Sequence, residues 1–314
     1  MRAVFYGTPQ FAAPALHALT RVAEVALVIC QPDKPKGRGL ELAPPPVKIA
    51  ATELGLLVAQ PTKLRDGALA AQLRALDVDV ALVIAYGRIL PRDVLDAPRR
   101  GSLNLHASLL PKYRGAAPIA WAVANGEAET GITLMEMDEG MDTGPMLAHV
   151  RTPIGADETQ GELAERLATL AAEMVFHDGE DTPFVRAVRG ELSATPQPEE
   201  GVSTAPILQK SDGLLDWTMP ARALHDRVRG MHPWPGGHTT QRGRGLRVHT
   251  TKLVALRTEE VPGTVLLADK RGVVVATGAG QAIELVRVQP EGKRVMSAAE
   301  WVNGRGVTQG DRLG

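Results

Sequence analysis

Apolar runs alternate with helical patterns along the first part of the chain. The runs are short and rich in Val, Ile, Leu and Ala, as in strands buried on both faces of a parallel sheet. Between them, apolar residues recur with helical spacing. The expected strands are Arg2–Tyr6, Glu24–Cys30, Leu57–Ala59, Val78–Ala85 and Ser102–His106, and the expected helices are Phe11–Leu19, Val47–Leu54 and Gly67–Leu76. This alternation predicts an α/β fold with a doubly wound, Rossmann-like parallel sheet.

The pattern changes near residue 191. Residues 191–206 are rich in Pro and Glu, and we interpret them as a linker. Beyond them, short apolar segments are separated by turns, which is typical of a small barrel. The expected strands are Leu214–Trp217, Arg247–Leu256, Gly263–Leu267, Val273–Thr277 and Ala282–Val288, with helices at Ala221–Met231 and Ala298–Val302. We therefore expect a first domain over residues 1–190 and a smaller OB-like β-barrel domain over residues 207–314.

One stretch, Ser102 to Leu147, brings three polar residues into a single supersecondary unit. Asn104 and His106 are two positions apart, so on a strand they point to the same face. The next helix and strand are expected at Pro118–Ala124 and Gly131–Met137, ahead of an acidic loop that contains Asp142. In a right-handed strand–helix–strand unit the two strands run parallel. Asn104, His106 and Asp142 are then expected at one edge of the sheet, where open parallel sheets bind ligands.

An amide, an imidazole and a carboxylate at one edge are suited to acyl transfer. The amide can donate to a developing oxyanion, and the imidazole can move protons near neutral pH. The carboxylate can orient the imidazole. No Ser or Cys occupies a strained nucleophile turn, so direct attack by a bound amine is favoured over a covalent enzyme intermediate. Taken by themselves, Asn104 and His106 are better interpreted as polar residues that cap a strand end.

Charge is distributed unevenly along the chain. The net charge is −1, but Pro206–Gly314 carries 16 Lys and Arg against 10 Asp and Glu, a balance of +6, and the remainder stands at −7. A basic C-terminal part suggests an anionic partner. Cys30 is the single cysteine and lies in an apolar run, and no Cys/His cluster has metal-ligand spacing. With neither a signal-peptide pattern nor an apolar run of membrane-spanning length, the expected compartment is the cytoplasm.

Four ordered strings connect this chemistry to a known family. They are Asn104-Leu-His-Ala-Ser-Leu-Leu-Pro111, Arg114-Gly-Ala-Ala-Pro118, Glu129-Thr-Gly-Ile-Thr133 and Met137-Asp-Glu-Gly-Met-Asp-Thr-Gly144. Together they resemble the signature of the folate-dependent formyltransferases. The resemblance implies that 10-formyltetrahydrofolate is the formyl donor, that no metal is needed and that Asn104, His106 and Asp142 are catalytic. It also implies folate contacts in two loops, at Tyr86, Gly87, Ser108, Leu109, Leu110 and Pro111.

Three further strings resemble the members of that family that act on methionyl-tRNA. Gln31–Pro46 is a loop rich in Pro and Gly, in which Lys34, Lys36 and Arg38 match a segment that approaches the acceptor end of tRNA. The strings Met231-His-Pro-Trp-Pro-Gly236 and Gly292-Lys-Arg-Val-Met-Ser-Ala-Ala299 match C-terminal segments, with His232 where Asn is usual. By this resemblance the C-terminal domain binds tRNA, with Arg244 and Lys293 among the candidates. On composition alone, the Gln31–Pro46 loop could be a solvated surface loop.

The expected activity is formyl transfer from 10-formyltetrahydrofolate to the α-amino group of methionine on initiator methionyl-tRNA, by a protein that we expect to be monomeric. Glycinamide ribonucleotide formyltransferases lack a second domain, and amino-sugar formyltransferases and formyltetrahydrofolate hydrolase modules fit the Gly37-Arg-Gly39 loop less well. A non-catalytic RNA-binding protein would not need the three polar residues. A dehydrogenase is disfavoured because the first turn, at Gly7, lacks the G-x-G-x-x-G fingerprint.

Overall fold

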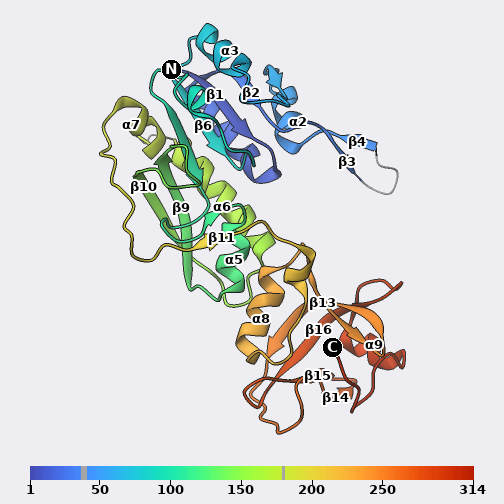
Figure 1. Cartoon of the computed structure of the whole chain (residues 1–314). Helices are drawn as coiled ribbons and strands as arrows, with labels where there is room; N and C mark the ends of the chain where they lie inside the picture. The colour runs from blue at the N-terminus through green and yellow to red at the C-terminus, as the bar shows by residue number, and fades with distance from the viewer. Residues whose placement is uncertain (37–40, 179–180) are drawn as a thin grey trace. The chain divides into compact units, whose positions relative to one another are not determined.

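The computed structural model describes residues 1–36, 41–178 and 181–314, and the chain divides into two compact units. Unit 1 consists of Met1–Pro118, Glu129–Thr152 and Ala164–Pro206. Unit 2 consists of Ile119–Ala128, Pro153–Leu163 and Ile207–Gly314. Each unit has its own sheet (Figure 1).

Unit 1 is built on a mostly parallel sheet with the strand order β10-β9-β7-β6-β1-β2-β5. The bounds are β1 Arg2–Gly7, β2 Glu24–Ile29, β5 Val58–Ala59, β6 Val80–Ile84, β7 Ser102–His106, β9 Glu129–Glu136 and β10 Met146–Pro153. The helices of this part of the chain are α1 Ala13–Val22, α2 Pro46–Glu53, α3 Ala68–Leu76, α4 Arg92–Leu95, α5 Pro118–Ala124, α6 Gln160–Val175 and α7 Pro183–Arg189, with a 3-10 turn, η1, at Gln10–Ala12. The predicted α/β fold with a mostly parallel sheet is confirmed.

The central strands form because both of their faces are buried. Every residue of β6 and β7 is buried, and one core cluster packs Leu73 of α3 and Leu95 of α4 against Tyr6 and Val83 of the sheet. In β6 a continuous apolar run is the sequence signal of such a strand, whereas β7 also buries three polar residues between its leucines. β7 ends at His106, so this rigid core strand fixes the backbone of Asn104 and His106.

The direction predicted for the strand after β7 is wrong. β9 pairs with β7 in the antiparallel sense, with Asn104 opposite Met135 and His106 opposite Thr133. A parallel connection needs a crossover helix that packs on the sheet. Here α5 belongs to unit 2 from Ile119 onward, where Gly230 of α8 approaches it so closely that a Cβ would lie 2.5 Å from the backbone nitrogen of Ala124.

Two small ladders extend unit 1. Strands β3 (Lys34–Lys36) and β4 (Glu41–Ala43) pair antiparallel, so the described part of the Gln31–Pro46 segment is the base of a hairpin, not an irregular loop. Strands β8 (Arg114–Gly115) and β11 (Thr204–Ala205) pair in parallel. This second ladder ties the predicted linker to the segment that follows β7.

Unit 2 has an antiparallel sheet with the order β12-β13-β16-β15-β14, and β17 pairs with β16. Its elements are a 3-10 turn, η2, at Lys210–Gly213, then α8 Ala221–Gly230, β12 Gly237–Gln241, β13 Arg244–Leu253, β14 Val265–Asp269, β15 Gly272–Thr277, β16 Gln281–Pro290, β17 Met296–Ser297 and α9 Ala298–Asn303. Leu224 of α8 and Trp301 of α9 pack on its core with Val248 and Leu285. Leu214–Trp217, expected as a strand, forms only an isolated bridge from Leu214 to His238.

Candidate active site

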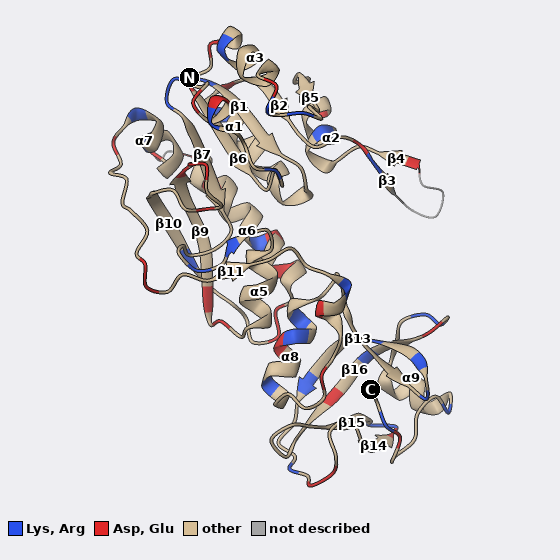
Figure 2. Cartoon of the chain, viewed as in Figure 1, with Lys and Arg blue, Asp and Glu red and all other residues tan. Residues whose placement is uncertain are grey.

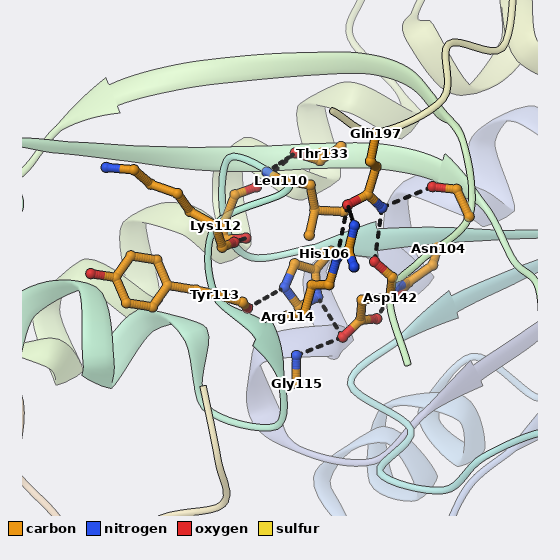
Figure 3. Close-up of polar contacts among 12 residues, drawn as sticks. Asn104, His106, Leu110, Lys112, Tyr113, Arg114, Gly115, Thr133, Asp142 and Gln197 are labelled. Atoms are coloured by element: carbon orange, nitrogen blue, oxygen red, sulfur yellow. Dashed lines mark hydrogen bonds and ion pairs between the residues drawn. The ribbon is translucent and has the colours of Figure 1, made fainter. Parts of the chain in front are cut away.

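Asn104, His106 and Asp142 come together in unit 1 (Figure 3). Asn104 and His106 lie on β7 and are 8% and 6% exposed. The Asn104 Nδ2 lies 3.4 Å from Asp142 Oδ1, and the His106 Nδ1 lies 3.6 Å from Asp142 Oδ2. Asp142 reaches them although β9 is antiparallel, because the loop between β9 and β10 folds back over β7. The sequence analysis predicted that these three side chains lie together, but it did so from a parallel strand–helix–strand unit, which the fold does not have.

A hydrogen bond from the main chain holds the Asp142 carboxylate in place. Its Oδ2 accepts a hydrogen bond of 2.8 Å from the backbone N–H of Gly115. Asp142 itself has a φ of 56°, in the left-handed region, as does Tyr113 at 62°. Such conformations cost free energy for residues with a Cβ and persist where the surroundings impose them. The loop therefore holds Asp142 in a defined orientation.

The ring of His106 has one nitrogen fixed and one directed into the site. Its Nε2 lies 2.9 Å from the carbonyl oxygen of Tyr113. A carbonyl can only accept, so this contact requires the proton on Nε2. The Nδ1 then faces the Asp142 carboxylate at 3.6 Å, which is too long for a hydrogen bond. We therefore identify Nδ1 as the nitrogen that is available to exchange a proton with a ligand.

A residue that sequence reasoning missed holds the acidic loop in place. Gln197 donates from Nε2 to the carbonyl oxygens of Asp142 and Gly144, each at 2.8 Å. Its Oε1 accepts from Nε and Nη2 of Arg114 at 3.0 and 2.7 Å. Gln197 lies in the segment that we interpreted as a linker. A single Gln between two prolines carries no local signal for partners so distant in the sequence.

The predicted folate turn follows β7 directly. Thr133 Oγ1 donates to the carbonyl oxygen of Ser108 at 2.7 Å and lies 3.2 Å from the backbone N of Leu110. Ser108 and Leu110 are buried, whereas Leu109 and Pro111 are partly exposed. The turn therefore offers a ligand its main chain and the side chains of Leu109 and Pro111.

The second predicted folate loop follows β6. The Tyr86 ring is buried and meets Tyr6 edge to face at 5.3 Å. Burial raises the pKa of the Tyr86 phenol. The carbonyl oxygen of Tyr86 accepts from Thr8 Oγ1 at 3.0 Å and from Gln31 Nε2 at 2.9 Å. Gly87 has a φ of 77°, and a Cβ on it would lie 2.6 Å from Gln31 Nε2. This loop too presents main chain, not its aromatic ring.

A cavity of about 450 Å³ opens beside this loop in unit 1. It is lined by Thr62, Lys63, Leu64, Arg65, Asp66, Arg88 and Ile89. The Arg88 guanidinium donates to the carbonyl oxygens of Pro61 and Thr62 and so braces the wall. Lys63, Arg65 and Asp66 are exposed, so the cavity presents two cations and one carboxylate to a ligand. Another cavity of about 420 Å³, near Met1, lies at the amino-terminal ends of β1 and β6 and contains none of the predicted site residues.

The predicted tRNA contacts fall in both units. Lys34 Nζ donates to Gln31 Oε1 at 2.9 Å, at the base of the β3–β4 hairpin. Hydrogen bonds from Lys48 and Gln60 lower the pKa of Asp33 beside it. Arg38 and the side chain of Lys36 lie outside the described residues. Arg244 and Lys293 are exposed in unit 2, and several Lys and Arg residues lie along the chain of this unit (Figure 2).

Two absences hold for the described residues. Within residues 1–36, 41–178 and 181–314, no three His, Cys, Asp or Glu side chains gather as metal ligands would. Over the same ranges, each helix falls short of the length and apolar character that a membrane span needs.

Known proteins match both units. A family model described as formyl transferase matches residues 1–177, and one described as formyl transferase, C-terminal domain, matches residues 207–306. The methionyl-tRNA formyltransferase of Sorangium cellulosum is 54% identical over 316 residues and is matched over 100% of both chains. That of Myxococcus xanthus is 48% identical over 312 residues, covering 99% of this chain and 97% of its own.

A solved structure shares the fold. WlaRD, a sugar 3N-formyl transferase solved in the presence of dTDP and 5-N-formyl-THF, has a TM-score of 0.65 at 15% identity. The match covers 94% of this chain and 99% of that one. Taken with the two full-length relatives, these matches show that the chain belongs to the formyl transferase family, and within it to the methionyl-tRNA formyltransferases.

Proposed function

We propose that this chain transfers the formyl group of 10-formyltetrahydrofolate to the α-amino group of methionine on initiator methionyl-tRNA, with Asn104, His106 and Asp142 as the catalytic residues. The observation that carries the proposal is the convergence of these three side chains in a protein whose full-length relatives are methionyl-tRNA formyltransferases. We expect it to act as a monomer in the cytoplasm, where translation begins.

The arrangement assigns a task to each side chain. The incoming amine must be neutral to attack, and a free α-amine with a pKa of about 7.7–8.0 loses its proton readily near neutral pH. Asn104 Nδ2 donates to the formyl oxygen as negative charge grows on it. His106, through Nδ1, takes the proton that the amine loses and delivers it, through water if needed, to the folate nitrogen that leaves. One C–N bond forms and one breaks, and the proton moves from the amine to the leaving nitrogen.

The acidic loop supports this exchange. Asp142 lies against both Asn104 and His106, so it can hold the orientation of both side chains. Gln197 fixes the backbone of Asp142 and therefore acts as a positioning residue. An imidazole whose other nitrogen is tied to Tyr113 cannot rotate away from the substrate.

The residues around the trio fit the formyl donor. By the resemblance to the family, the loop at Tyr86 and Gly87 and the turn Ser108–Pro111 would line the pterin site. The neighbouring cavity presents Lys63 and Arg65, which suit the glutamate carboxylates of a folate. Carboxylate chemistry explains why this cavity is basic although unit 1 belongs to the acidic part of the chain.

The remaining sequence-based assignments fit the same proposal. Lys34, Lys36 and Arg38, in the Gln31–Pro46 segment of the sequence, would contact the acceptor end of tRNA. Residues 1–190 would be the catalytic domain, 191–206 a linker and 207–314 an OB-like tRNA-binding domain with Arg244 and Lys293 among its contacts. The antiparallel sheet of unit 2 with its buried core supports the barrel assignment.

A single assay tests the proposed function. The protein is incubated with 10-formyltetrahydrofolate and initiator methionyl-tRNA, and formylmethionine is measured after deacylation. Elongator methionyl-tRNA and an amino sugar nucleotide serve as competing acceptors. Formylation of the initiator species above both is expected. Formylation of the amino sugar instead would contradict the proposal.

A further inference from the structure

One tryptophan of unit 2 is exposed to solvent, whereas the two tryptophans in the core of this unit are buried. Trp234 is 51% exposed, whereas Trp217 and Trp301 are 5% and 3% exposed. Trp234 lies in the turn between α8 and β12, with a proline on each side. Proline restricts the backbone, so an indole held there loses little conformational freedom on meeting a ligand.

Both ends of this turn lie beside basic side chains of β13. At one end, the His232 ring meets the His249 ring at 5.9 Å, edge to face. At the other end, a Cβ built on Gly236 would lie 3.9 Å from Nη1 of Arg247. On the neighbouring strand β16, Arg287 lies opposite Thr250 of β13. We call the group His232, Trp234, Arg247, His249 and Arg287 the Trp234 surface.

The cations of the Trp234 surface have no acidic partners among the residues that the structure describes. Elsewhere in unit 2, Arg242, Arg271 and Arg294 pair with Asp311, Asp269 and Glu300. Arg247 and Arg287 are exposed and form no ion pair within the described ranges.

The titration of His249 reflects the same surroundings. Burial first, and then His232, Arg247 and Arg287, lower its pKa against a raising hydrogen bond from Gln289. Both arginines of the Trp234 surface therefore act on His249. Glu162 also faces His232, but its carboxylate caps α6 through Thr159.

We propose that Trp234 stacks on an unpaired base of the RNA substrate while Arg247 and Arg287 bind the phosphates beside that base. An exposed aromatic face among unpaired cations is the combination that recognises single-stranded or unpaired nucleotides. An acidic protein segment would use the cations but has no planar group for the indole. This inference rests on the proposed function for the identity of the RNA, but not for the position of the surface.

Direct binding of uncharged initiator tRNA across a salt series tests the proposal. Trp234→Leu should weaken binding about tenfold or more, since base stacking on an aromatic side chain contributes on that scale, while Trp234→Phe should retain most of the affinity. Arg247→Gln should lower the slope of log K against log salt by roughly 0.7–0.9, the value for one phosphate contact. Arg271→Gln removes the same charge at the opposite side of the sheet and should change neither quantity.

Fluorescence gives a second readout. In the wild type, tRNA should quench the emission of the exposed Trp234, and in Trp234→Phe this quenching should disappear although binding persists. Unchanged thermal midpoints would show that the variants are folded. If Trp234→Leu or Arg247→Gln unfolds, the loss of tRNA quenching in Trp234→Phe still shows whether Trp234 contacts the RNA.

Two results separate this inference from the proposed function. If the wild type formylates methionyl-tRNA but Trp234→Leu and Arg247→Gln bind tRNA as the wild type does, with the same salt slope, the Trp234 surface is not an RNA site. If formylation is not found but the variants lose RNA binding as described, the surface stands and the proposed reaction fails.

Discussion

The side chain of Gln197 is hydrogen-bonded to the main chain of Asp142, 55 residues away, at 2.8 Å. Asp142 is one of seven non-glycine residues with a positive φ in the described part of the chain, and Tyr113 and Ala85 are two others beside the same site. Long-range hydrogen bonds hold two of them, since Gln197 donates to the carbonyl oxygen of Asp142 and the Tyr113 N–H donates to Ser203 Oγ. The Gln197 amide bridges Arg114, on the chain after β7, to the loop that carries the carboxylate.

Removing this bridge should lower turnover without removing a reacting group. In Gln197→Ala the loop loses both bonds to its carbonyls, and in Gln197→Glu a carboxylate faces them instead of a donor. A displacement of about 1 Å at a catalytic group can reduce the rate roughly a hundredfold, so we expect kcat to fall on that scale in both variants. KM for donor and for tRNA should stay within about twofold, because Gln197 contacts neither.

The matched control is Gln72→Ala, an exposed glutamine on α3, which should behave as the wild type. A Gln197→Ala enzyme with normal kcat would show that Asp142 keeps its place without the bridge.

Asn104→Ala tests the oxyanion donor. Loss of one such donor typically costs on the order of 10²–10³ in kcat. Affinity for tRNA, measured by direct binding, should be nearly unchanged, because Asn104 is buried and does not face bulk solvent. A variant with a normal turnover number would exclude Asn104 from the catalytic trio.

Gly115→Ala tests the main-chain support of the Asp142 carboxylate. Gly115 has a φ of 121°, and a Cβ on it would lie 2.7 Å from the carbonyl oxygen of Ala205. The strand β8 must therefore shift, and the N–H that Gly115 donates to Asp142 moves with it. We expect a large loss of kcat together with a lower thermal midpoint.

Gly101→Ala provides the comparison for this backbone change. Gly101 also has a positive φ, of 73°, but has nothing within 4 Å of an added Cβ. It should lose some stability and keep its kcat. Equal kinetic losses in the two variants would mean that backbone strain alone, and not the contact with Asp142, accounts for the effect.

The cationic cavity predicts a preference among folates. Replacing Lys63 and Arg65 together by Gln should raise KM for 10-formyltetrahydrofolate up to about tenfold, since a solvent-exposed ion pair contributes roughly 0.2–1 kcal/mol and two are lost. The effect should grow with the number of glutamates on the donor, and kcat should not change. Lys270→Gln in unit 2 is the control. A KM independent of these cations would remove the cavity from the donor site.

Elements buried on both faces could be predicted from the sequence, and their directions could not. The bounds of β7 and α5 match the expectation residue for residue, and α5 ends where the breaker pair Asn125-Gly126 begins. A hydrophobic pattern reads the same in both directions, so it could not show that β9 runs antiparallel. That outcome depends on α5 joining unit 2 through its close contact at Gly230.

Polar elements could be predicted less well from the sequence. Strand β12, Gly237–Gln241, contains no large apolar residue, so its sequence resembles a loop. The role of Gln197 can be recognised only when the positions of Arg114 and Asp142 around it are known. The trio itself could be predicted because its members lie in strings that resemble a family, although the geometry first used to bring them together was wrong.

His225 should make the stability of unit 2 dependent on pH. It is 3% exposed, with Nε2 at 3.2 Å from the carbonyl oxygen of Ala156 and Nδ1 at 2.9 Å from Thr251 Oγ1. Burial lowers its pKa, outweighing the raising effects of Asp226 and Asp157. Below an unfolded pKa of about 6.5, the unfolded chain therefore binds a proton that the folded one excludes. By linkage, stability must fall as the pH decreases through that value.

Tryptophan emission can follow this unit alone, because all four tryptophans, Trp121, Trp217, Trp234 and Trp301, belong to it. The thermal midpoint of the wild type should drop between pH 7 and pH 5. His225→Gln should cost on the order of 1–2 kcal/mol at pH 7.5 through weakened hydrogen bonds, but its midpoint should change less over the same range. His17→Gln, an exposed histidine of unit 1, should leave the wild-type profile unchanged. Parallel profiles for wild type and His225→Gln would assign the pH dependence to other groups.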